Sequence, residues 1–343
     1  MITPVSKDID LQQLFYKDDF SVPSKGYMGL NLAGKIKFTL ILRGAYNKVN
    51  RFHKGALKHK TCYIGPFWGE FGNFLLHFLP YVSFLYKNGV KVNICCLENY
   101  LPLLIDDEGN KLYNECIPLR MFFKEVYPTG NRVTPPADVE AKYEEFRKVA
   151  VSSGMPFLDL TDYNLYWFVY KNWQLEGRQY GYHLEKLFKD SSITGNNVTL
   201  FPRRKSAGYT INNGDPIDYM KLAESISPYF DNVFITGHPS MSAEIYEKGN
   251  IKVKLSENNI DVLKCCANSS LIVTQHSGAM HLGQYVNVPV ALIFKGKLPV
   301  KGLDDSNRFI QNIQRSNVYI ALTEEQLVNF VRDKLYLKRP GNL

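Results

Sequence analysis

The sequence contains no apolar run near the roughly 20 residues that a transmembrane helix needs. Its first residues also lack the basic start and the apolar stretch of a secretory signal peptide. These absences predict a cytoplasmic chain without a membrane span, although peripheral contact with a membrane stays open. Internal repeats and low-complexity segments are absent as well. With 343 residues, 45% of them apolar, the chain is long enough for two globular domains.

Cysteine is scarce, and its spacing excludes two common uses. Four of the six cysteines form adjacent pairs, Cys95-Cys96 and Cys265-Cys266, inside apolar runs. Such pairs suit neither a zinc site nor a disulfide framework. Reduced, packed thiols are the simpler interpretation. No Cys/His or carboxylate cluster is evident in the sequence.

Acidic residues are missing from 191–214, within a chain whose formal charge is +8. Most of the basic residues are scattered, and no RNA-recognition signature or zinc finger is present, so we expect no nucleic-acid partner. In this acid-free segment, however, Arg203, Arg204 and Lys205 follow a predicted strand directly. Cations at a strand end can hold two phosphates. A solvated basic turn is the alternative.

Residues 61–97 have the pattern of a βαβ unit. Strands are expected at 61–64 and 90–97, with a glycine-rich elbow at 65–72 and a helix at 73–87 between them. An earlier strand is expected at 38–42, and a helix at 136–153. The aromatic segment 163–182 could stack sugars, but a core role is the simpler interpretation.

The second half repeats the alternation of strands and helices. Strands are expected at 198–201, 232–236, 253–255, 271–274 and 288–294, and helices at 215–228, 241–248, 260–267 and 323–335. This pattern is typical of a doubly wound sheet. We therefore predict an α/β protein with two Rossmann-like domains, residues 1–190 and 191–320, and a C-terminal helix and tail at 321–343.

The elbow of the first domain carries a carboxylate, Glu70. Gly69 and Gly72 allow a ligand to approach the backbone closely, and Asn73 begins the expected helix. A carboxylate at this position could act as a general base for an acceptor hydroxyl. The alternative is a first-turn glutamate that favours the helix dipole.

Two elbows of the second domain reach the corresponding sheet edge. After strand 271–274 come His276, Ser277 and Gly278, followed by a helix that contains His281. The amino end of a helix favours an anion such as a nucleotide diphosphate, although a plain turn would explain the glycine equally well. Gly237-His238 follows the strand 232–236, where the imidazole could stack on a base or cap a helix.

Two motif pairs resemble the heptosyltransferase-like branch of the GT-B glycosyltransferases. Gly69-Glu70 precedes Leu79-Pro80, as a Gly-Asp elbow precedes Leu-Pro in that family. The segment 277–282 matches the Asp-Thr-Gly-x-x-His-Leu elbow at Ser277, Gly278, His281 and Leu282. The sequence departs from the family where Glu70 replaces aspartate, where two residues are added before Leu-Pro, and where His276 replaces an acidic residue.

The resemblance implies two domains that face a central cleft, with the acceptor bound by the first and a nucleotide sugar by the second. It implies an inverting hexosyl- or related transferase that acts on a hydroxyl of a glycan or glycoconjugate. It also implies no metal and no cofactor, with the nucleotide-diphosphate sugar as the donor substrate. Glu70 would be the base. The donor would contact Arg203, Arg204, Lys205, Gly237, His238, His276, Ser277, Gly278 and His281, and the acceptor side would include Gly69, Gly72 and Asn73.

Two other interpretations stay open. The same scaffold could carry a sugar-nucleotide epimerase or a ketal-forming pyruvyl transferase. The chain could also be a non-catalytic protein that binds a glycan or another anion through its basic surface.

Overall fold

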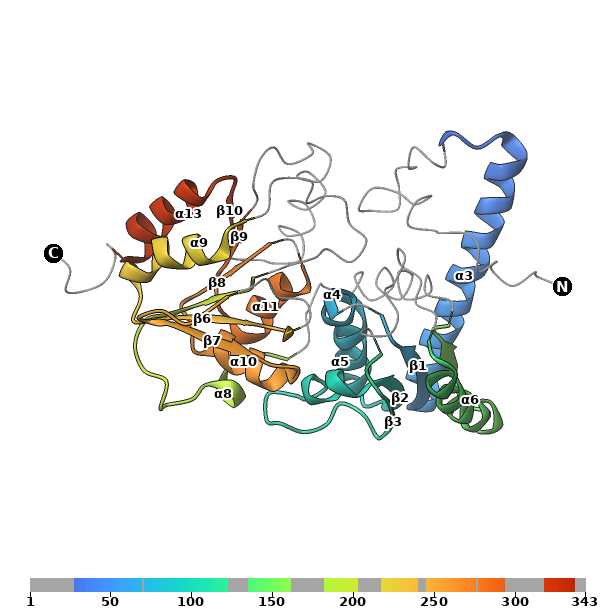
Figure 1. Cartoon of the computed structure of the whole chain (residues 1–343). Helices are drawn as coiled ribbons and strands as arrows, with labels where there is room; N and C mark the ends of the chain where they lie inside the picture. The colour runs from blue at the N-terminus through green and yellow to red at the C-terminus, as the bar shows by residue number, and fades with distance from the viewer. Residues whose placement is uncertain are drawn as a thin grey trace. The chain divides into compact units, whose positions relative to one another are not determined.

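The chain folds into two compact units, each built on one parallel sheet. The computed structural model describes residues 28–69, 71–122, 135–161, 182–202, 217–239, 245–275, 277–293 and 318–336. Unit 1 comprises residues 1–106 and 110–181, and unit 2 comprises residues 107–109 and 182–343. The strand order is β3-β2-β1-β4 in the first sheet and β10-β9-β8-β5-β6-β7 in the second (Figure 1). The predicted pair of α/β domains is confirmed.

The sheet of unit 1 contains β1 (Thr61–Phe67), β2 (Lys91–Leu97), β3 (Glu115–Leu119) and β4 (Phe157–Asp159). β1 is longer than predicted and runs through Gly65, with an irregular register between Ile64 and Phe67. Gly65 has a φ of +155°, and a Cβ there would lie 2.7 Å from the carbonyl oxygen of Cys95. Only glycine therefore lets β2 approach this closely.

Helices cover both faces of this sheet. They are α3 (Leu32–His59), α4 (Phe71–Asn73), the π-helical η1 (Phe74–Phe78), α5 (Leu79–Lys87), the 3₁₀ helix η2 (Glu98–Leu103) and α6 (Ala137–Ser152). α3 packs on β1 and β4, α5 packs on β2, and α6 packs on β1, β3 and β4. His53 of α3 stacks on Phe84 of α5, with ring centroids 5.5 Å apart. α3 and α5 thus share one face, and α6 covers the other.

The strand predicted at 38–42 is wrong, because these residues lie inside α3. The Asn31 side chain caps this helix by accepting a hydrogen bond from the Gly34 backbone N–H at 2.8 Å. Phe38, Ala45, Val49 and Phe52 are all buried at helical spacing. That period extends over four turns, which outweighs the β preference of a five-residue apolar run.

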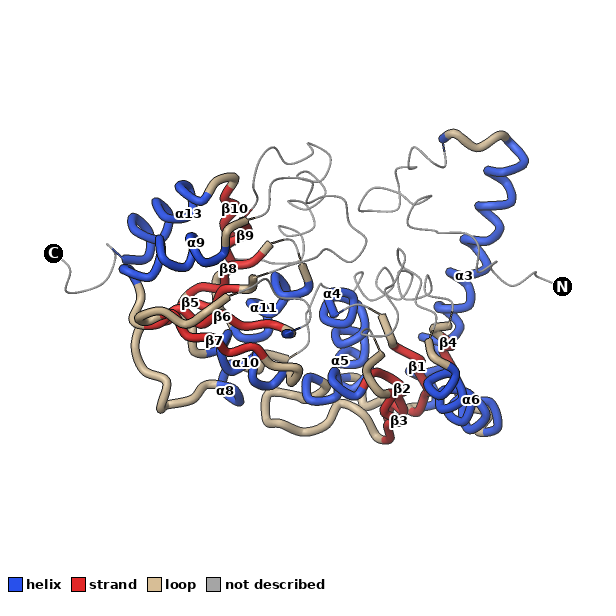
Figure 2. Tube along the Cα trace, viewed as in Figure 1, coloured by secondary structure: helices blue, strands red, loops and turns tan. Residues whose placement is uncertain are grey.

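Unit 2 has the strand order of a Rossmann fold. Its strands are β5 (Asn197–Leu200), β6 (Asn232–Gly237), β7 (Ile251–Leu255), β8 (Leu271–Thr274), β9 (Val290–Ile293) and β10 (Val318–Ala321). Its helices are α8 (Glu185–Phe188), α9 (Tyr219–Ile226), η4 (Ser227–Tyr229), α10 (Asn259–Ala267), η6 (Gly278–His281), α11 (Leu282–Val286), α13 (Glu324–Phe330) and the π-helical η7 (Val331–Tyr336). Figure 2 shows α9 and α13 on one side of this sheet and α10 and α11 on the other.

Two boundary predictions need correction. The segment 182–190 was assigned to the first domain, but α8 packs on α10 and α11 of unit 2. The Leu184 N–H donates to the Tyr285 carbonyl at 2.6 Å, which fixes this segment to unit 2. The predicted end of the helix at 241–248 is also wrong, because residues 245–247 are irregular and Lys248 forms a β-bridge with Ile251.

Other expectations are confirmed. α6 and α10 lie where helices were predicted. The C-terminal helix α13 begins at the expected Thr323, whose hydroxyl accepts a hydrogen bond from the Gln326 N–H at 3.1 Å. The aromatic segment 163–182 lies outside the described residues except for Tyr182. All six cysteines are free, and all but Cys116 are buried.

Two kinds of feature are absent from the described residues. No helix there is long and apolar enough to cross a membrane. No group of three or more His, Cys, Asp or Glu side chains in the same residues is arranged as metal ligands would be.

Candidate active site

Each sheet has one point where the direction of strand addition reverses. In unit 1, β2 and β3 are added on one side of β1 and β4 on the other. In unit 2, β6 and β7 are added on one side of β5, and β8, β9 and β10 on the other. Ligands of open α/β sheets bind beyond the carboxyl ends of the strands at such a switch point. The carboxyl ends of β1 and β4, and those of β5 and β8, are therefore the two candidate binding edges.

The elbow after β1 stands at the edge of unit 1, as the sequence predicted. Glu70 itself lies outside the described residues, between Gly69 and Phe71. The hydroxyl of the buried Tyr100 donates to the carbonyl oxygen of Gly69 at 3.0 Å. The Tyr100 ring stacks on Phe74 with centroids 4.4 Å apart. An aromatic core beneath the sheet edge thus holds the residue that precedes Glu70.

The expected acceptor-side residues Gly72 and Asn73 lie in α4, the short helix that starts after the elbow. Both are half-buried. The helix then widens into the π-helical segment η1, where the Leu79 N–H donates to the Phe74 carbonyl five residues earlier. π-helical turns are rare and occur mostly as single turns inside α-helices, as this one does between α4 and α5. The turn also suits Pro80, which has no N–H to donate.

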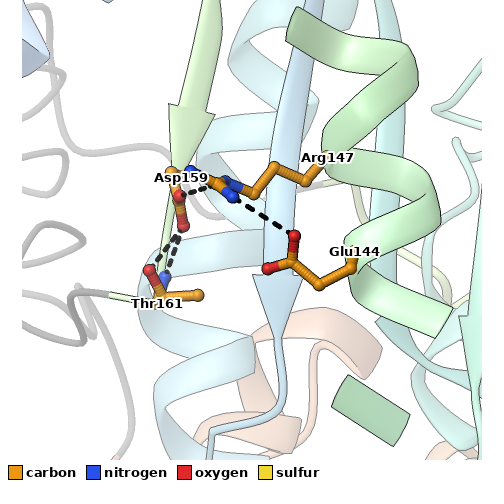
Figure 3. Close-up of polar contacts among 4 residues, drawn as sticks. All are labelled: Glu144, Arg147, Asp159 and Thr161. Atoms are coloured by element: carbon orange, nitrogen blue, oxygen red, sulfur yellow. Dashed lines mark hydrogen bonds and ion pairs between the residues drawn. The ribbon is translucent and has the colours of Figure 1, made fainter. Parts of the chain in front are cut away.

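Sequence reasoning missed Asp159, a carboxylate at the same edge. It ends β4 and is the register partner of Gly65 in β1. Its Oδ1 accepts hydrogen bonds from the Thr161 N–H at 2.9 Å and from the Thr161 hydroxyl at 2.7 Å (Figure 3). Its Oδ2 lies 3.7 Å from Nε of Arg147, which also pairs with Glu144. Because both oxygens are engaged, Asp159 fixes the loop that leaves β4.

β4 was missed because it has only three residues. The available signal was a short apolar pair, Phe157-Leu158, followed directly by an acidic residue.

Trp68 connects this edge to α6. Its ring meets that of Tyr143 edge to face, with centroids 5.7 Å apart. Burial, together with the nearby Asp159 carboxylate, raises the pKa of Tyr143 far above its usual value. The phenol is therefore protonated at any working pH, and it acts as a packing group beneath the elbow.

The edge of unit 2 is built on β8, whose bounds match the prediction. His276 lies outside the described residues. Ser277 is extended, with φ −154°, and does not cap the following helix through its side chain. Its Oγ lies 3.1 Å from Oγ1 of the buried Thr274. This contact ties the residue after the elbow to the end of the strand.

The helix expected after Gly278 is shorter and tighter than predicted. η6 is a 3₁₀ turn of four residues, and α11 adds five more. Fewer aligned peptide groups give a smaller dipole, so less anion stabilisation can come from this helix than the sequence suggested. Ser277 and Gly278 are half-buried, which leaves part of their backbone open to solvent.

The remaining candidates differ in how much they could offer a ligand. His281 is only 5% exposed, so no more than an edge of its ring could reach a donor. Gly237 ends β6 with φ +140°, and His238 follows it half-buried. β6 and β8 flank β5 in the sheet. Gly237-His238 and Ser277-Gly278 therefore lie at the carboxyl ends of the two strands that flank β5.

Arg203, Arg204 and Lys205 lie outside the described residues. The chain is described up to Pro202, and the Phe201 N–H donates to the Val273 carbonyl of β8 at 3.0 Å. In the sequence, the basic triplet follows directly after Pro202.

Solved structures with two Rossmann-like domains match most of this chain. It is similar to the E. coli heptosyltransferase WaaC with ADP-2-deoxy-2-fluoro heptose, with a TM-score of 0.52 and 12% identity over 80% of this chain and 99% of that chain. It is also similar to a glycosyl transferase family 9 protein from Veillonella parvula, with a TM-score of 0.52 and 13% identity over 83% and 92% of the two chains. The fold is GT-B.

A third GT-B structure, the E. coli ADP-heptose LPS heptosyltransferase II, matches with a TM-score of 0.51 and 14% identity over 79% of this chain and 97% of that chain. The sequence matches no protein-family model and none of the curated proteins. At these identities the likeness establishes the GT-B fold, and the chemistry has to come from the residues at the two sheet edges.

Proposed function

We propose that this GT-B chain is a glycosyltransferase. It would move a sugar from a nucleotide-diphosphate donor to a hydroxyl of a glycan or glycoconjugate, with inversion and without a bound metal. One observation carries the proposal. The neighbouring strands β5 and β8 form the switch point, and each is followed in the sequence by residues that suit an anion. The basic triplet 203–205 comes after β5, and Ser277-Gly278 comes after β8. That arrangement suits a diphosphate better than it suits a neutral ligand.

The chemical step needs a base, an acceptor and a stabilised leaving group. Glu70 would take the proton of the acceptor hydroxyl while that oxygen attacks the anomeric carbon. The bond from the anomeric carbon to the diphosphate oxygen would break on the opposite face, and the nucleoside diphosphate would leave. Because η6 and α11 are short, Arg203, Arg204 and Lys205 would supply most of the charge that stabilises it.

The remaining residues have supporting roles in this proposal. Backbone N–H groups at Ser277 and Gly278 would face the diphosphate, and Gly237, His238, His276 and the ring edge of His281 would line the nucleoside and sugar. Gly69, Gly72 and Asn73 would contact the acceptor. A cytoplasmic location and donor binding by unit 2, with acceptor binding by unit 1, belong to the same proposal.

The donor can be approached first through its nucleotide. WaaC and heptosyltransferase II are described with ADP-linked heptose, so we place ADP first among the candidates. Thermal unfolding against ADP, UDP, GDP, CMP and TDP should give a clear rise in Tm with one of them. A ligand at 100 times its Kd adds about 2.7 kcal/mol of stability.

Two matched variants distinguish binding at a specific nucleotide site from nonspecific attraction to positive charge. Arg203→Ala should abolish the rise in Tm. Lys248→Ala should preserve it, since Lys248 pairs with Glu224 at 2.8 Å on the surface. A flat response to all five nucleotides would transfer support to the non-catalytic binding protein.

The catalytic role is tested at Glu70. Glu70→Gln should lower kcat by about 100-fold or more, with nucleotide binding unchanged. Glu98→Gln is the matched control, because Glu98 also follows a strand of unit 1 directly, at the start of η2. Full activity in Glu70→Gln would refute the assignment of the base.

Product analysis separates the other enzymes. Nucleoside diphosphate that appears only after an acceptor is added would count against both the epimerase and the pyruvyl transferase. ADP-heptose and nucleotide-linked hexose donors should be compared in the same assay to identify the transferred sugar.

A further inference from the structure

α3 carries an apolar stripe on its solvent face, opposite the stripe that packs into unit 1. Leu32, Ile36 and Leu40 are 75%, 53% and 62% exposed, and they lie one helical turn apart. Met28, which precedes α3 in the chain, is 61% exposed. The buried side chains Phe38, Ala45, Val49, Phe52 and Ala56 occupy the opposite face.

The same helix is strongly basic. Residues 20–69 contain no Asp or Glu. α3 contains Lys35, Lys37, Arg43, Lys48, Arg51, Lys54 and Lys58. Arg43, Lys54 and Lys58 continue the exposed face beyond Leu40, and all three are exposed. The solvent face of α3 is therefore apolar from Leu32 to Leu40 and cationic beyond Leu40.

The second half of α3 is held by contacts with α5 and with the residue before β4. His53 accepts or donates a hydrogen bond with the Tyr81 hydroxyl of α5 at 3.0 Å. A Cβ on Gly55 would lie 2.9 Å from Pro156, at the start of β4. Figure 1 shows the helix running past the edge of the small sheet, with its N-terminal half farther from β1.

We propose that this face of α3 binds the anionic surface of a lipid bilayer. Leu32, Ile36 and Leu40 would enter the boundary between headgroups and acyl chains, and the cations beyond Leu40 would contact lipid phosphates. An apolar stripe combined with Lys and Arg is the composition of helices that lie in this interface. The helix lies on the bilayer and does not cross it, in keeping with its many charges.

Charge complementarity selects this occupant over two others. A second copy would bring one acid-free basic helix against another, and like charges would oppose the contact. Nucleic acid would be held by the cations alone and would leave the three aliphatic side chains in water. A bilayer with anionic lipid satisfies both halves of the face.

The test uses the complete chain without donor or acceptor, so its outcome is independent of the proposed enzyme activity. Co-sedimentation with vesicles of phosphatidylcholine alone is compared with co-sedimentation with vesicles that also contain phosphatidylglycerol, an anionic lipid whose surface potential attracts basic segments. The wild-type chain should partition to the anionic vesicles about tenfold or more strongly, and less so as salt is raised.

Variants locate the contact. Leu32→Gln/Ile36→Gln/Leu40→Gln should weaken partitioning by about tenfold or more, since the apolar area is lost. Val149→Gln/Val151→Gln is the matched control, because these α6 residues are also more than half exposed, at 52% and 63%. That control should partition as the wild type does. Circular dichroism and Tm should be unchanged in both.

Three outcomes would overturn the proposal. The wild type could fail to bind anionic vesicles at any lipid concentration. The triple glutamine variant could bind as the wild type does, which would indicate charge attraction alone. A wild-type dimer in light scattering, converted to monomer by the triple variant, would assign the stripe to a second copy.

Discussion

The Tyr100 hydroxyl lies 3.0 Å from the carbonyl oxygen of Gly69, to which it donates a hydrogen bond. This bond joins η2, which follows β2, to the elbow that follows β1. It places the aromatic core under the residue that precedes the proposed base. A buried tyrosine thus supports the backbone immediately before the position of the proposed base.

Tyr100→Phe should separate these two effects. The loss of one buried hydrogen bond should cost about 1 kcal/mol of unfolding free energy. Because the Glu70 elbow loses its support, kcat should fall about tenfold while the nucleotide Kd stays unchanged. Urea unfolding, transferase kinetics and nucleotide titration measure the three quantities.

Tyr86→Phe is the control, since it also removes a tyrosine hydroxyl from unit 1, one that donates weakly to Asp106 at 3.4 Å. Equal loss of kcat in both variants would show that the Gly69 bond has no special role.

Asp159 should act through its oxygen acceptors more than through its charge. Asp159→Ala removes both hydrogen bonds to Thr161 and should cost about 1–2 kcal/mol. Asp159→Asn retains an oxygen for the Thr161 N–H, and the half-exposed partner Arg147 contributes little. The free energy of unfolding should therefore fall less than half as far in Asp159→Asn as in Asp159→Ala. Urea midpoints of the two variants decide this, and equal losses would mean that the ion pair dominates.

Gly283 is required by the close approach of α11 to the strand that follows it. A Cβ there would lie 2.6 Å from the backbone oxygen of Val288 and would also clash with the Val290 side chain. Backbone cannot yield as a flexible side chain can, so Gly283→Ala should destabilise the chain by about 1–3 kcal/mol.

The neighbouring Gln284→Ala changes the same helix without adding an atom near β9, and it should be close to neutral. Thermal or urea unfolding compares the two. If Gly283→Ala were as stable as the wild type, α11 would be able to shift away from residues 288–290 without a cost in stability.

Cys116 should be the first of the six thiols to react. A hydrogen bond from Cys96 lowers the pKa of Cys116, and Cys116 is only partly buried. Burial instead raises the pKa of Cys62 to about 12. A lowered pKa gives more thiolate at neutral pH, and the thiolate is the reactive form. As the pH is raised, the reaction rate of Cys116 should therefore level off at a lower pH than that of a free thiol, whose pKa is about 8.5.

Ellman's reagent applied to the native protein measures this. One rapid thiol is expected, and Cys116→Ser should remove it while Cys62→Ser should not. Two or more rapid thiols in the native protein would contradict the burial of the other five cysteines.

Periodicity was sufficient where a segment satisfies its own backbone and buries one face. β8 was predicted to the residue, and the C-terminal helix from its Thr323 cap, because the apolar spacing and the capping residue are local signals. The same reasoning failed at 38–42, where a helical face that extends to Ala56 decides the conformation.

The sequence by itself determined the fold class, the two-domain division and the elbows that carry Glu70 and Ser277-Gly278. It placed the basic triplet after a strand, and the motif pairs pointed to GT-B. These features are local, since each depends on residues that are neighbours in the chain.

Only the tertiary structure decided which strands are neighbours. The positions of β4 beside β1 and β8 beside β5 create the two switch points, and they bring Asp159 to Gly65 and Thr274 to the β5 edge. The bond from Tyr100 to Gly69 and the exposed stripe of α3 were likewise invisible in the sequence. Burial and strand order depend on contacts between residues far apart in the chain, which no local pattern encodes.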